Sequence, residues 1–417
     1  MRQHLPEVLR QRGYRRLWIA LIAMSLAAQM IAVAVGWQVY EIRRNPLDLG
    51  LIGLAEFVPL PLLALPAGQL ADRLSRRLVF VVSLVGDIAI AALLLVVTLS
   101  GAHSLWPFLV LAAASGVSAA LGTPAARALP PELVSSELLA SAMAVRSTGM
   151  QAAVVAGPAV GGVLFVIAPE LVYGVAVGLF ALAAICVVAM GRGVGVAGIV
   201  EQAPGAAGLL AGIRFLLHTR IILGAILLDL FAVLFGGAIA LAPVFARTIL
   251  HVGPVGLGVL RSAPAAGGVV AGLWLTRRPL RGRAGRTLLL AVAAFGACMI
   301  VFGLSEWFAL SVAALAVSGL VDMISMNIRA TTVALATPDE LRGRVNAVEM
   351  VFISASNELG AFESGVTAAL LGTVRSVVLG GVATIAIAAA WPRLFPSLAG
   401  LDRLETVRPE LETASAT

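Results

Sequence analysis

Long apolar runs recur along the whole chain, and they constrain its fold more than any other feature. A helix needs about 20 apolar residues to cross the hydrocarbon core of a bilayer. Runs of that length lie at residues 17–40, 47–70, 78–99, 105–128, 140–168 and 169–190, and again at 221–246, 254–276, 287–304, 307–331, 345–371 and 374–396. The sequence therefore predicts an all-α membrane protein with 12 transmembrane helices in two sets of six.

The composition excludes several classes of protein. Hydrophobic residues make up 60% of the chain and charged residues 12%, with a mean hydropathy of +1.00, which is far outside the range of soluble domains. The net charge of +7 comes from arginines in short clusters between apolar runs, so we expect no nucleic-acid partner. No P-loop, HExxH motif or Ser-His-Asp set is visible, so we expect no enzyme and no ATP-driven transport. Cys186 and Cys298 lie inside apolar runs and the four histidines lie at loops or ends, so we expect no metal and no cofactor.

The arginines also predict the orientation of the chain. Cytoplasmic loops of membrane proteins carry an excess of basic residues. Only Arg43, Arg44, Arg247 and Arg375 fall on the side opposite the two termini, so both termini are predicted to be cytoplasmic. The predicted parts are an N-terminal six-helix bundle at 1–190, a cytoplasmic linker at 191–220, a C-terminal six-helix bundle at 221–396 and a cytoplasmic tail at 397–417.

The two halves resemble each other at one junction. The stretch "LPPELVSSELLASAMAV" (129–145) enters the fifth span, and "TPDELRGRVNAVEM" (337–350) enters the eleventh. Each is a turn with a proline, an acidic residue and a leucine, followed by the start of a helix. Internal repeats of this kind are typical of secondary transporters, which place a binding site between two bundles.

The stretch "GQLADRLSRR" (68–77) lies between the second and third spans, on the predicted cytoplasmic side. Gly68 permits close approach of two helix ends, and Asp72 is suited to accept N–H groups at the start of the third span. The pattern of Gly68, Asp72, Arg73, Arg76 and Arg77 resembles the signature loop of the major facilitator superfamily. That resemblance implies a conformational latch between two bundles that rock about a central site.

Three stretches of the second half carry a closer resemblance. They are "LLDLFAVLFGGAIALAPVFARTIL" (227–250) with "GLGVLRSAPAAGG" (256–268), "DMISMNIRATTVALATPDELRGRVNAV" (322–348) and "SNELGAFESG" (356–365). They are similar to the bacterial branch of the superfamily that contains enterobactin exporters and macrolide efflux pumps. The fifth span carries Gly157, Pro158, Gly161 and Gly162, which are similar to the motif of members that export by antiport and predict a kinked helix.

Ionisable residues inside the spans are the candidates for chemistry, because each costs about 2.5–3.5 kcal/mol at the centre of a membrane helix. A carboxylate removed from water can bind and release a proton near neutral pH. The proton-coupling candidates are Asp229, Asp322 and Glu358, followed by Glu363 and Asp87; the substrate-cavity candidates are Glu56, Arg146, Arg261, Asn327, Arg329 and Asn357. Glu349 lies near a helix end and is interpreted as a helix-terminal charge. Ser318, Asp322, Ser325 and Arg329 fall on one face of the tenth span. The alternative for each acid is a purely structural pairing with an arginine.

Together these features predict a monomeric, multi-pass transporter of the bacterial inner membrane. We expect proton-coupled efflux of a small amphipathic molecule, such as a macrolide-like drug or a siderophore. An importer or symporter on the same fold is the first alternative. A lipid-translocating membrane protein is the second.

Overall fold

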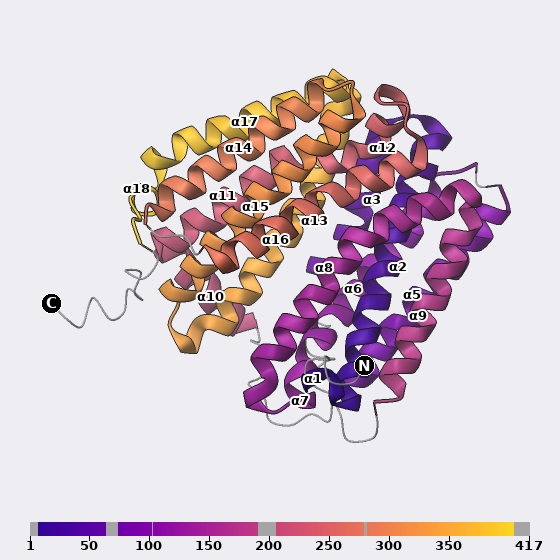
Figure 1. Cartoon of the computed structure of the whole chain (residues 1–417), viewed down its shortest axis with the longest axis horizontal. Helices are drawn as coiled ribbons and strands as arrows, with labels where there is room; N and C mark the ends of the chain where they lie inside the picture. The colour runs from indigo at the N-terminus through magenta and orange to yellow at the C-terminus, as the bar shows by residue number, and fades with distance from the viewer. Residues whose placement is uncertain (1–6, 64–73, 102, 191–205, 279–281, 404–417) are drawn as a thin grey trace. The chain divides into compact units, whose positions relative to one another are not determined.

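The computed structural model describes residues 7–63, 74–101, 103–190, 206–278 and 282–403, and the regular structure in these ranges is helical, with no strand. The first half contains α1 (Glu7–Arg10), α2 (Arg12–Arg43), α3 (Pro46–Phe57), α5 (Arg76–Leu99), α6 (Trp106–Ala128), α7 (Pro130–Leu133), α8 (Ser136–Ile167) and α9 (Pro169–Val188). The second half contains α10 (Ala206–His218), α11 (Arg220–Gly236), α12 (Ala242–Val244), α13 (Gly253–Arg277), α14 (Ala284–Leu304), α15 (Phe308–Ala336), α16 (Asp339–Leu371), α17 (Thr373–Leu394) and α18 (Pro396–Ala399). These helices are drawn in Figure 1.

Within these ranges, 11 helices are long and apolar enough to cross a membrane. They match the predicted spans except the eleventh, which corresponds to α16. That helix has 33 residues, so at 1.5 Å per residue it is about 50 Å long, well above the thickness of a bilayer. Composition alone does not identify it because polar residues interrupt its apolar run. Of the twelve predicted spans, α16 is therefore long enough to cross a membrane but is less apolar than the other eleven.

The seventh span differs from the single helix that its apolar sequence predicts. Its α-helical part, α11, ends at Gly236, and Gly237 has φ −70° and ψ 35°. A 3-10 turn (Ala238–Leu241), the short α12 and a π-helical turn (Phe245–Ile249) follow. Glycine weakens a helix and proline lacks the N–H that a continuous helix needs, so Gly237 and Pro243 account for this break.

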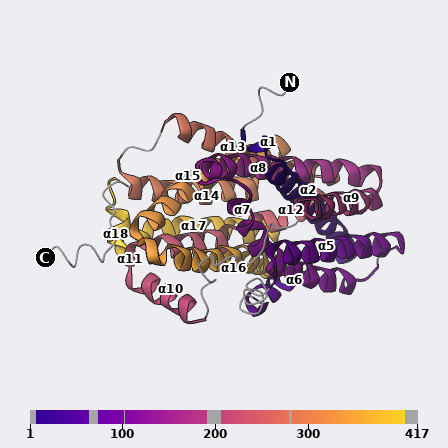
Figure 2. The same ribbon diagram turned by 90° about the horizontal axis from the view of Figure 1, so that it is seen from below.

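Contacts divide the chain into two compact units. The N-terminal unit comprises Met1–Arg44, Ala55–Ala203 and His251–Ser262, and the C-terminal unit comprises Asn45–Leu54, Pro204–Leu250 and Ala263–Thr417. In the N-terminal unit, α2 packs against α8 and α9, and α5 packs against α6 and α9 (Figures 1 and 2). In the C-terminal unit, α14 packs against α15 and α17, and α11 packs against α16 and α17 (Figure 1). The linker region contains α10, which packs against α16.

The glycines of α8 let neighbouring helices approach closely. A Cβ atom on Gly161 would lie 2.9 Å from the Cα atom of Met30 in α2, and one on Gly157 would lie 2.6 Å from the Cβ atom of Gln29. On another side of α8, a Cβ atom on Gly162 would lie 2.5 Å from the Pro254 carbonyl oxygen at the start of α13. Any side chain at these positions would collide with a neighbour. Pro158 lies inside α8, which is continuous from Ser136 to Ile167.

The third span begins with a capped helix. Ser75 is the N-cap of α5, and its Oγ atom accepts a hydrogen bond from the Leu78 N–H at 3.3 Å. The expectation that Asp72 accepts N–H groups at the start of this helix stays a prediction. Gly68, Asp72 and Arg73 themselves lie outside the described residues.

The two described arginines of this loop bind other parts of the N-terminal unit. The Arg76 Nη1 atom lies 2.6 Å from the Glu132 Oε1 atom of α7. The Arg77 guanidinium donates hydrogen bonds to the carbonyls of Val187, at 3.0 Å, and Val188. These carbonyls belong to the last turn of α9, where the helix dipole favours a cation.

Candidate functional site

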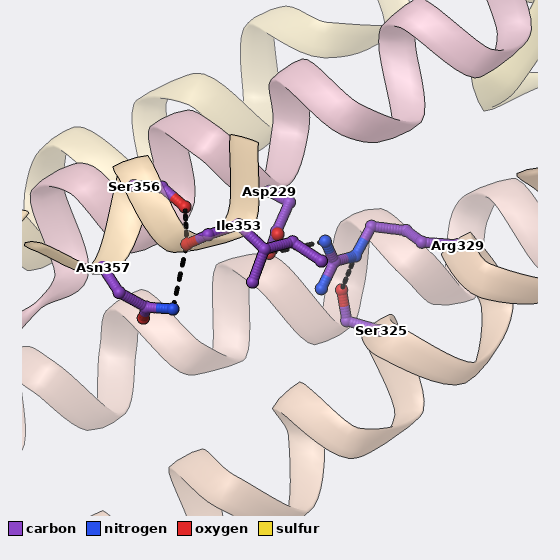
Figure 3. Close-up of polar contacts among 6 residues, drawn as sticks. All are labelled: Asp229, Ser325, Arg329, Ile353, Ser356 and Asn357. Atoms are coloured by element: carbon purple, nitrogen blue, oxygen red, sulfur yellow. Dashed lines mark hydrogen bonds and ion pairs between the residues drawn. The ribbon is translucent and has the colours of Figure 1, made fainter. Parts of the chain in front are cut away.

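A buried ion pair joins two helices of the C-terminal unit. Asp229 of α11 and Arg329 of α15 lie with Oδ1 and Nη1 2.5 Å apart, and their side chains are 11% and 10% exposed (Figure 3). The Arg329 Nε atom also donates a hydrogen bond to the Ser325 Oγ atom at 3.3 Å. A buried ion pair is tolerated only where geometry and further hydrogen bonds compensate for lost hydration.

The local sequence explains how these two side chains meet. Asp229 is the one ionisable residue of α11 apart from Arg220 at its first position, so the helix is otherwise free to bury apolar side chains. On α15, Ser318, Ser325 and Arg329 are buried, whereas Asp322, the fourth residue of the same predicted face, is exposed. Asp229 is thus the single acidic side chain that the otherwise apolar α11 places against the polar face of α15.

Two small cavities adjoin the ion pair, and Asp229 lines both. The first, of about 10 Å³, is lined by Ala225, Ile226, Asp229, Leu230, Arg329, Val333, Glu349, Phe352 and Ile353. The second, also of about 10 Å³, is lined by Asp229, Ala232, Val233, Ala291, Val292, Phe295, Asp322 and Ser325. Each cavity therefore adds one further carboxylate, Glu349 or Asp322, to walls that are otherwise mainly apolar.

The charges of this site do not balance. Asp322 and Glu349 each interact attractively with Arg329 and repulsively with Asp229. Three carboxylates thus share one guanidinium, and only Asp229 is in direct contact with it. With all groups ionised, the site carries two net negative charges, which favours the uptake of protons or another cation.

Sequence reasoning missed Glu349. Its position near the start of the predicted eleventh span suggested a helix-terminal charge, but α16 begins at Asp339, ten residues earlier. Glu349 therefore lies within the helix rather than at its end, and it lines a cavity together with Arg329. The available signal was the shared face of Glu349 and Ser356, two turns apart on α16.

The other proton-coupling candidates lie apart from the ion pair and line neither cavity. Glu358 lies beside α3, where its Oε2 atom is 3.2 Å from the position of a Cβ atom on Gly53. Glu363 is half-buried, and its backbone carbonyl accepts a hydrogen bond from Thr367 Oγ1 at 2.9 Å. Asp87 belongs to the N-terminal unit, where it is half-buried next to Ser118.

The substrate-cavity candidates fall into different surroundings. Glu56 and Arg261 attract each other within the N-terminal unit. Asn327 and Asn357 are exposed, and Asn357 Nδ2 donates to the Ile353 carbonyl one turn earlier at 3.0 Å (Figure 3). Arg146 is half-buried in the N-terminal unit, beside Tyr14. Of this set, the structure brings only Arg329 to Asp229. Among the residues that the structure describes, no three His, Cys, Asp or Glu side chains form a group that could hold a metal ion.

Comparison with known proteins gives a consistent family likeness. Residues 6–405 match the family described as "Transmembrane secretion effector". The chain is 26% identical over 380 residues to the enterobactin exporter of Citrobacter koseri, covering 89% of this chain and 88% of that protein. It is also 26% identical over 380 residues to the enterobactin exporter of Shigella dysenteriae, with the same coverage.

Solved structures of several transporters share the fold of this chain. A bacterial homologue of the human lysosomal transporter Spinster, in an inward-facing and unoccupied conformation, superposes with a TM-score of 0.76 at 16% identity, covering 96% of this chain and 99% of that one. A bacterial homologue of the iron transporter ferroportin, in an inward-facing state, gives a TM-score of 0.71 at 16% identity, covering 94% and 99%.

Proposed function

The chain belongs to the transmembrane secretion effector family of major facilitator transporters, and from this premise we propose that it exports a small amphipathic molecule in exchange for protons. It is a multi-pass protein of the bacterial inner membrane and not an enzyme. The cargo is a siderophore or a macrolide-like drug. Relatives named as enterobactin exporters support the choice of a secreted small molecule and the outward direction.

The observation that carries the proposal is the ion pair of Asp229 and Arg329, with Asp322 in one adjoining cavity and Glu349 in the other. A structural ion pair needs one acid and one base. Two additional carboxylates around the same guanidinium exceed what a structural pair requires, and their repulsion of Asp229 raises the free energy of the fully ionised site. A site that exchanges protons uses such an excess, because each protonation relieves the repulsion.

The proposed cycle follows from this electrostatic competition. A proton that binds Asp229 removes the charge that holds Arg329, and the guanidinium is then attracted to Asp322 or Glu349. Release of the proton restores the pair with Asp229. The two positions of Arg329 give the C-terminal unit two states, and a cargo that favours one of them is thereby coupled to proton movement.

The remaining predicted residues keep secondary roles in this proposal. Glu358, Glu363 and Asp87 are further proton carriers. Glu56, Arg146, Arg261, Asn327 and Asn357 line the path of the cargo. The loop of Gly68, Asp72, Arg73, Arg76 and Arg77 acts as the latch, and Gly157, Pro158, Gly161 and Gly162 serve as the antiporter-type motif. The protein works as a monomer of two six-helix bundles, at 1–190 and 221–396, joined by the cytoplasmic linker at 191–220 and followed by the cytoplasmic tail at 397–417, with both termini in the cytoplasm.

Everted membrane vesicles that contain the full chain test the proposal. Respiration makes the interior of such vesicles acidic, so an exporter driven by protons accumulates its cargo inside them. Radiolabelled erythromycin and enterobactin serve as probes of the two cargo classes. We expect uptake of at least one probe, together with a cargo-dependent loss of the pH gradient, and collapse of uptake when a protonophore is added.

The alternatives give different results in the same vesicles. Uptake that persists after the protonophore would contradict proton coupling. A symporter or importer would accumulate the probe in right-side-out vesicles and not in everted ones. Transfer of a fluorescent phospholipid between leaflets, without transport of either probe, would support a lipid-translocating protein.

A further inference from the structure

We propose that the second cavity beside the ion pair, which Asp229, Asp322 and Ser325 line, binds a single water molecule that passes protons between the two carboxylates. This inference rests on the proposed exchange of cargo for protons and adds the path by which a proton reaches Asp229. The ligand of the cavity is therefore water, which connects an acid that solvent reaches with an acid that is buried.

The cavity has the size of one water molecule. It lies among three helices of the C-terminal unit: α11 supplies Asp229, Ala232 and Val233, α14 supplies Ala291, Val292 and Phe295, and α15 supplies Asp322 and Ser325. Its volume of about 10 Å³ is close to the least space that a buried water needs. This volume excludes anything much larger than water, including the cargo.

The polar lining of the cavity matches what a buried water requires. Ordered waters inside proteins make about three hydrogen bonds, whereas cavities with wholly apolar walls stay dry. Here the carboxylates of Asp229 and Asp322 can accept hydrogen bonds from a water molecule, and the Ser325 hydroxyl can donate one to it. The other five lining residues are apolar, so these three side chains are the partners that the cavity offers.

The Ser325 hydroxyl is satisfied only as an acceptor. The residue is 3% exposed, and its Oγ atom accepts the hydrogen bond from Arg329 Nε at 3.3 Å (Figure 3). On the same helix, Ser318 and Thr332 each donate from the hydroxyl to a carbonyl of the preceding turn, at 2.7 and 2.8 Å. Within the described residues Ser325 makes no such bond, either to its own helix or to the two carboxylates. Because a buried donor is rarely left unsatisfied, its acceptor is expected in the cavity that it lines.

The two carboxylates differ in their access to solvent. Asp322 is exposed, whereas the Asp229 side chain is 11% exposed and pairs with Arg329. A charged side chain within a membrane span faces water rather than lipid, because lipid does not solvate the charge. A proton from solvent therefore reaches Asp322 first and needs a carrier to reach Asp229. A water molecule in the cavity that both acids line is such a carrier.

The transfer balances without any further reactant. Protonated Asp322 gives its proton to the water oxygen as the water gives one of its own protons to the Asp229 carboxylate. One O–H bond breaks at Asp322, one forms at Asp229, and the water molecule is regenerated. Asp229 is then neutral, so it attracts the Arg329 guanidinium less strongly.

Charge favours the second cavity over the first for this step. Arg329 lines the first cavity, and its positive charge opposes a proton in transit. The second cavity has two acids and no base in its lining, and α14 contributes only apolar side chains to it. A resident metal ion is not favoured, because no three His, Cys, Asp or Glu side chains of the described residues form a group that could hold one.

Hydroxyl-radical labelling of the full chain in detergent, with radicals made from water by a short X-ray pulse, tests for the bound water. A buried water molecule oxidises the side chains beside it, so Val292, which is 4% exposed, and Phe295 should be labelled. Leu288 of α14 is fully buried and lines neither cavity, so it should stay unlabelled. Mass spectrometry of the peptides measures the oxidation of each side chain.

Ala291→Val and Ala232→Val fill the cavity without changing a polar group. Each should lower the oxidation of Val292 and Phe295 about tenfold, and slow cargo-driven proton entry into proteoliposomes by a similar factor. If one of the two does not fold, the other still tests the proposal. Ala297→Val is the matched control and should change neither measurement, because Ala297 is an exposed residue of α14 outside the lining.

Ser325→Ala separates the loss of a polar partner from the loss of space. This variant enlarges the cavity and removes the hydroxyl, so lower oxidation of Val292 and Phe295 cannot be steric. Oxidation that is unchanged in Ser325→Ala would overturn the role of this serine as an anchor of the water.

The remaining outcomes decide between the proposal and its alternatives. Wild-type oxidation of Val292 and Phe295 no higher than that of Leu288, or unchanged in both filling variants, would overturn the proposal. Oxidation that falls when sodium chloride replaces choline chloride would assign the cavity to a cation and overturn it as well. Normal proton entry in both filling variants would overturn the role of the water as a carrier. The labelling uses no proton gradient, so failure of proton-driven export leaves its result intact.

Discussion

The Asp229 carboxylate and the Arg329 guanidinium, which are 100 residues apart in sequence, lie 2.5 Å apart between α11 and α15. Asp229 lines both of the cavities that adjoin the pair, whereas Arg329 lines only the first. Both cavities are therefore exposed to the Asp229 charge. Substitutions at this pair therefore test both the stability of the fold and the coupling of transport to protons.

Removal of one partner of the pair should destabilise the protein more than removal of both. Asp229→Asn removes the direct partner of Arg329 and leaves Asp322 and Glu349 to compensate its charge, so the loss should lie below the cost of about 3–5 kcal/mol for a buried charge left wholly unpaired. The double variant Asp229→Asn/Arg329→Gln removes both charges and should recover much of that loss. Thermal unfolding of the four proteins in one detergent measures the coupling energy. Additive losses in the double variant would contradict a direct interaction.

Loss of the acid in the second cavity should uncouple transport from protons. Asp322→Asn has the same shape but cannot bind a proton, so flux in proteoliposomes should no longer respond to an imposed pH gradient. Exchange of cargo without a gradient should continue. Ser318→Ala is the control, because Ser318 lies on the same face of α15 and its hydroxyl bonds only the Leu315 carbonyl at 2.7 Å. Full coupling in Asp322→Asn would exclude this residue.

Glu349→Gln tests the residue that the sequence did not single out. If Glu349 is an alternative partner of Arg329, its neutralisation should hold the guanidinium on Asp229 or Asp322 and reduce the rate of proton-driven flux about tenfold. Glu306 lies in the turn between α14 and α15 and is exposed, so Glu306→Gln should leave the rate unchanged. Equal rates of proton-driven flux in Glu349→Gln and wild type would show that Glu349 is not an alternative partner of Arg329, and would support its interpretation as a helix-terminal charge.

Close packing of α8 on α2 should make Gly161→Ala destabilising by about 1–3 kcal/mol. The new methyl group would lie 2.9 Å from the Met30 Cα atom, which belongs to the backbone and has little room to move. Gly178→Ala in α9 is the matched control, since a Cβ atom there meets nothing within 4 Å and alanine favours a helix. Thermal unfolding should rank Gly178→Ala at or above wild type, and a similar loss in both variants would argue against the close contact.

The N-cap of α5 gives a local test of where this helix starts. Ser75→Ala removes the acceptor for the Leu78 N–H and should cost about 0.5–2 kcal/mol. Asp72→Ala should have a smaller effect on unfolding, because Ser75 immediately precedes the first residue of α5. A larger loss in Asp72→Ala than in Ser75→Ala would contradict Ser75 as the main cap.

The sequence by itself determined the features that depend on local periodicity and composition. Apolar runs of span length indicate the helices, because a bilayer accepts little else. The spacing of Ser318, Asp322, Ser325 and Arg329 indicates a shared face of α15, because a helix repeats every 3.6 residues. The family likeness also follows from short motifs that can be read in order along the chain.

Only the tertiary structure decided which charges meet. Periodicity assigns Arg329 to the same face as Asp322, but the contact that forms is with Asp229 on another helix. Periodicity likewise assigns no partner to Glu349 or Arg146. In the structure, Glu349 lines a cavity together with Arg329, and the buried Arg146 Nε–H has no acceptor in the described residues. The reason is physical: a helix fixes the direction of its own side chains, whereas the identity of the facing helix depends on how apolar surfaces from distant segments pack together.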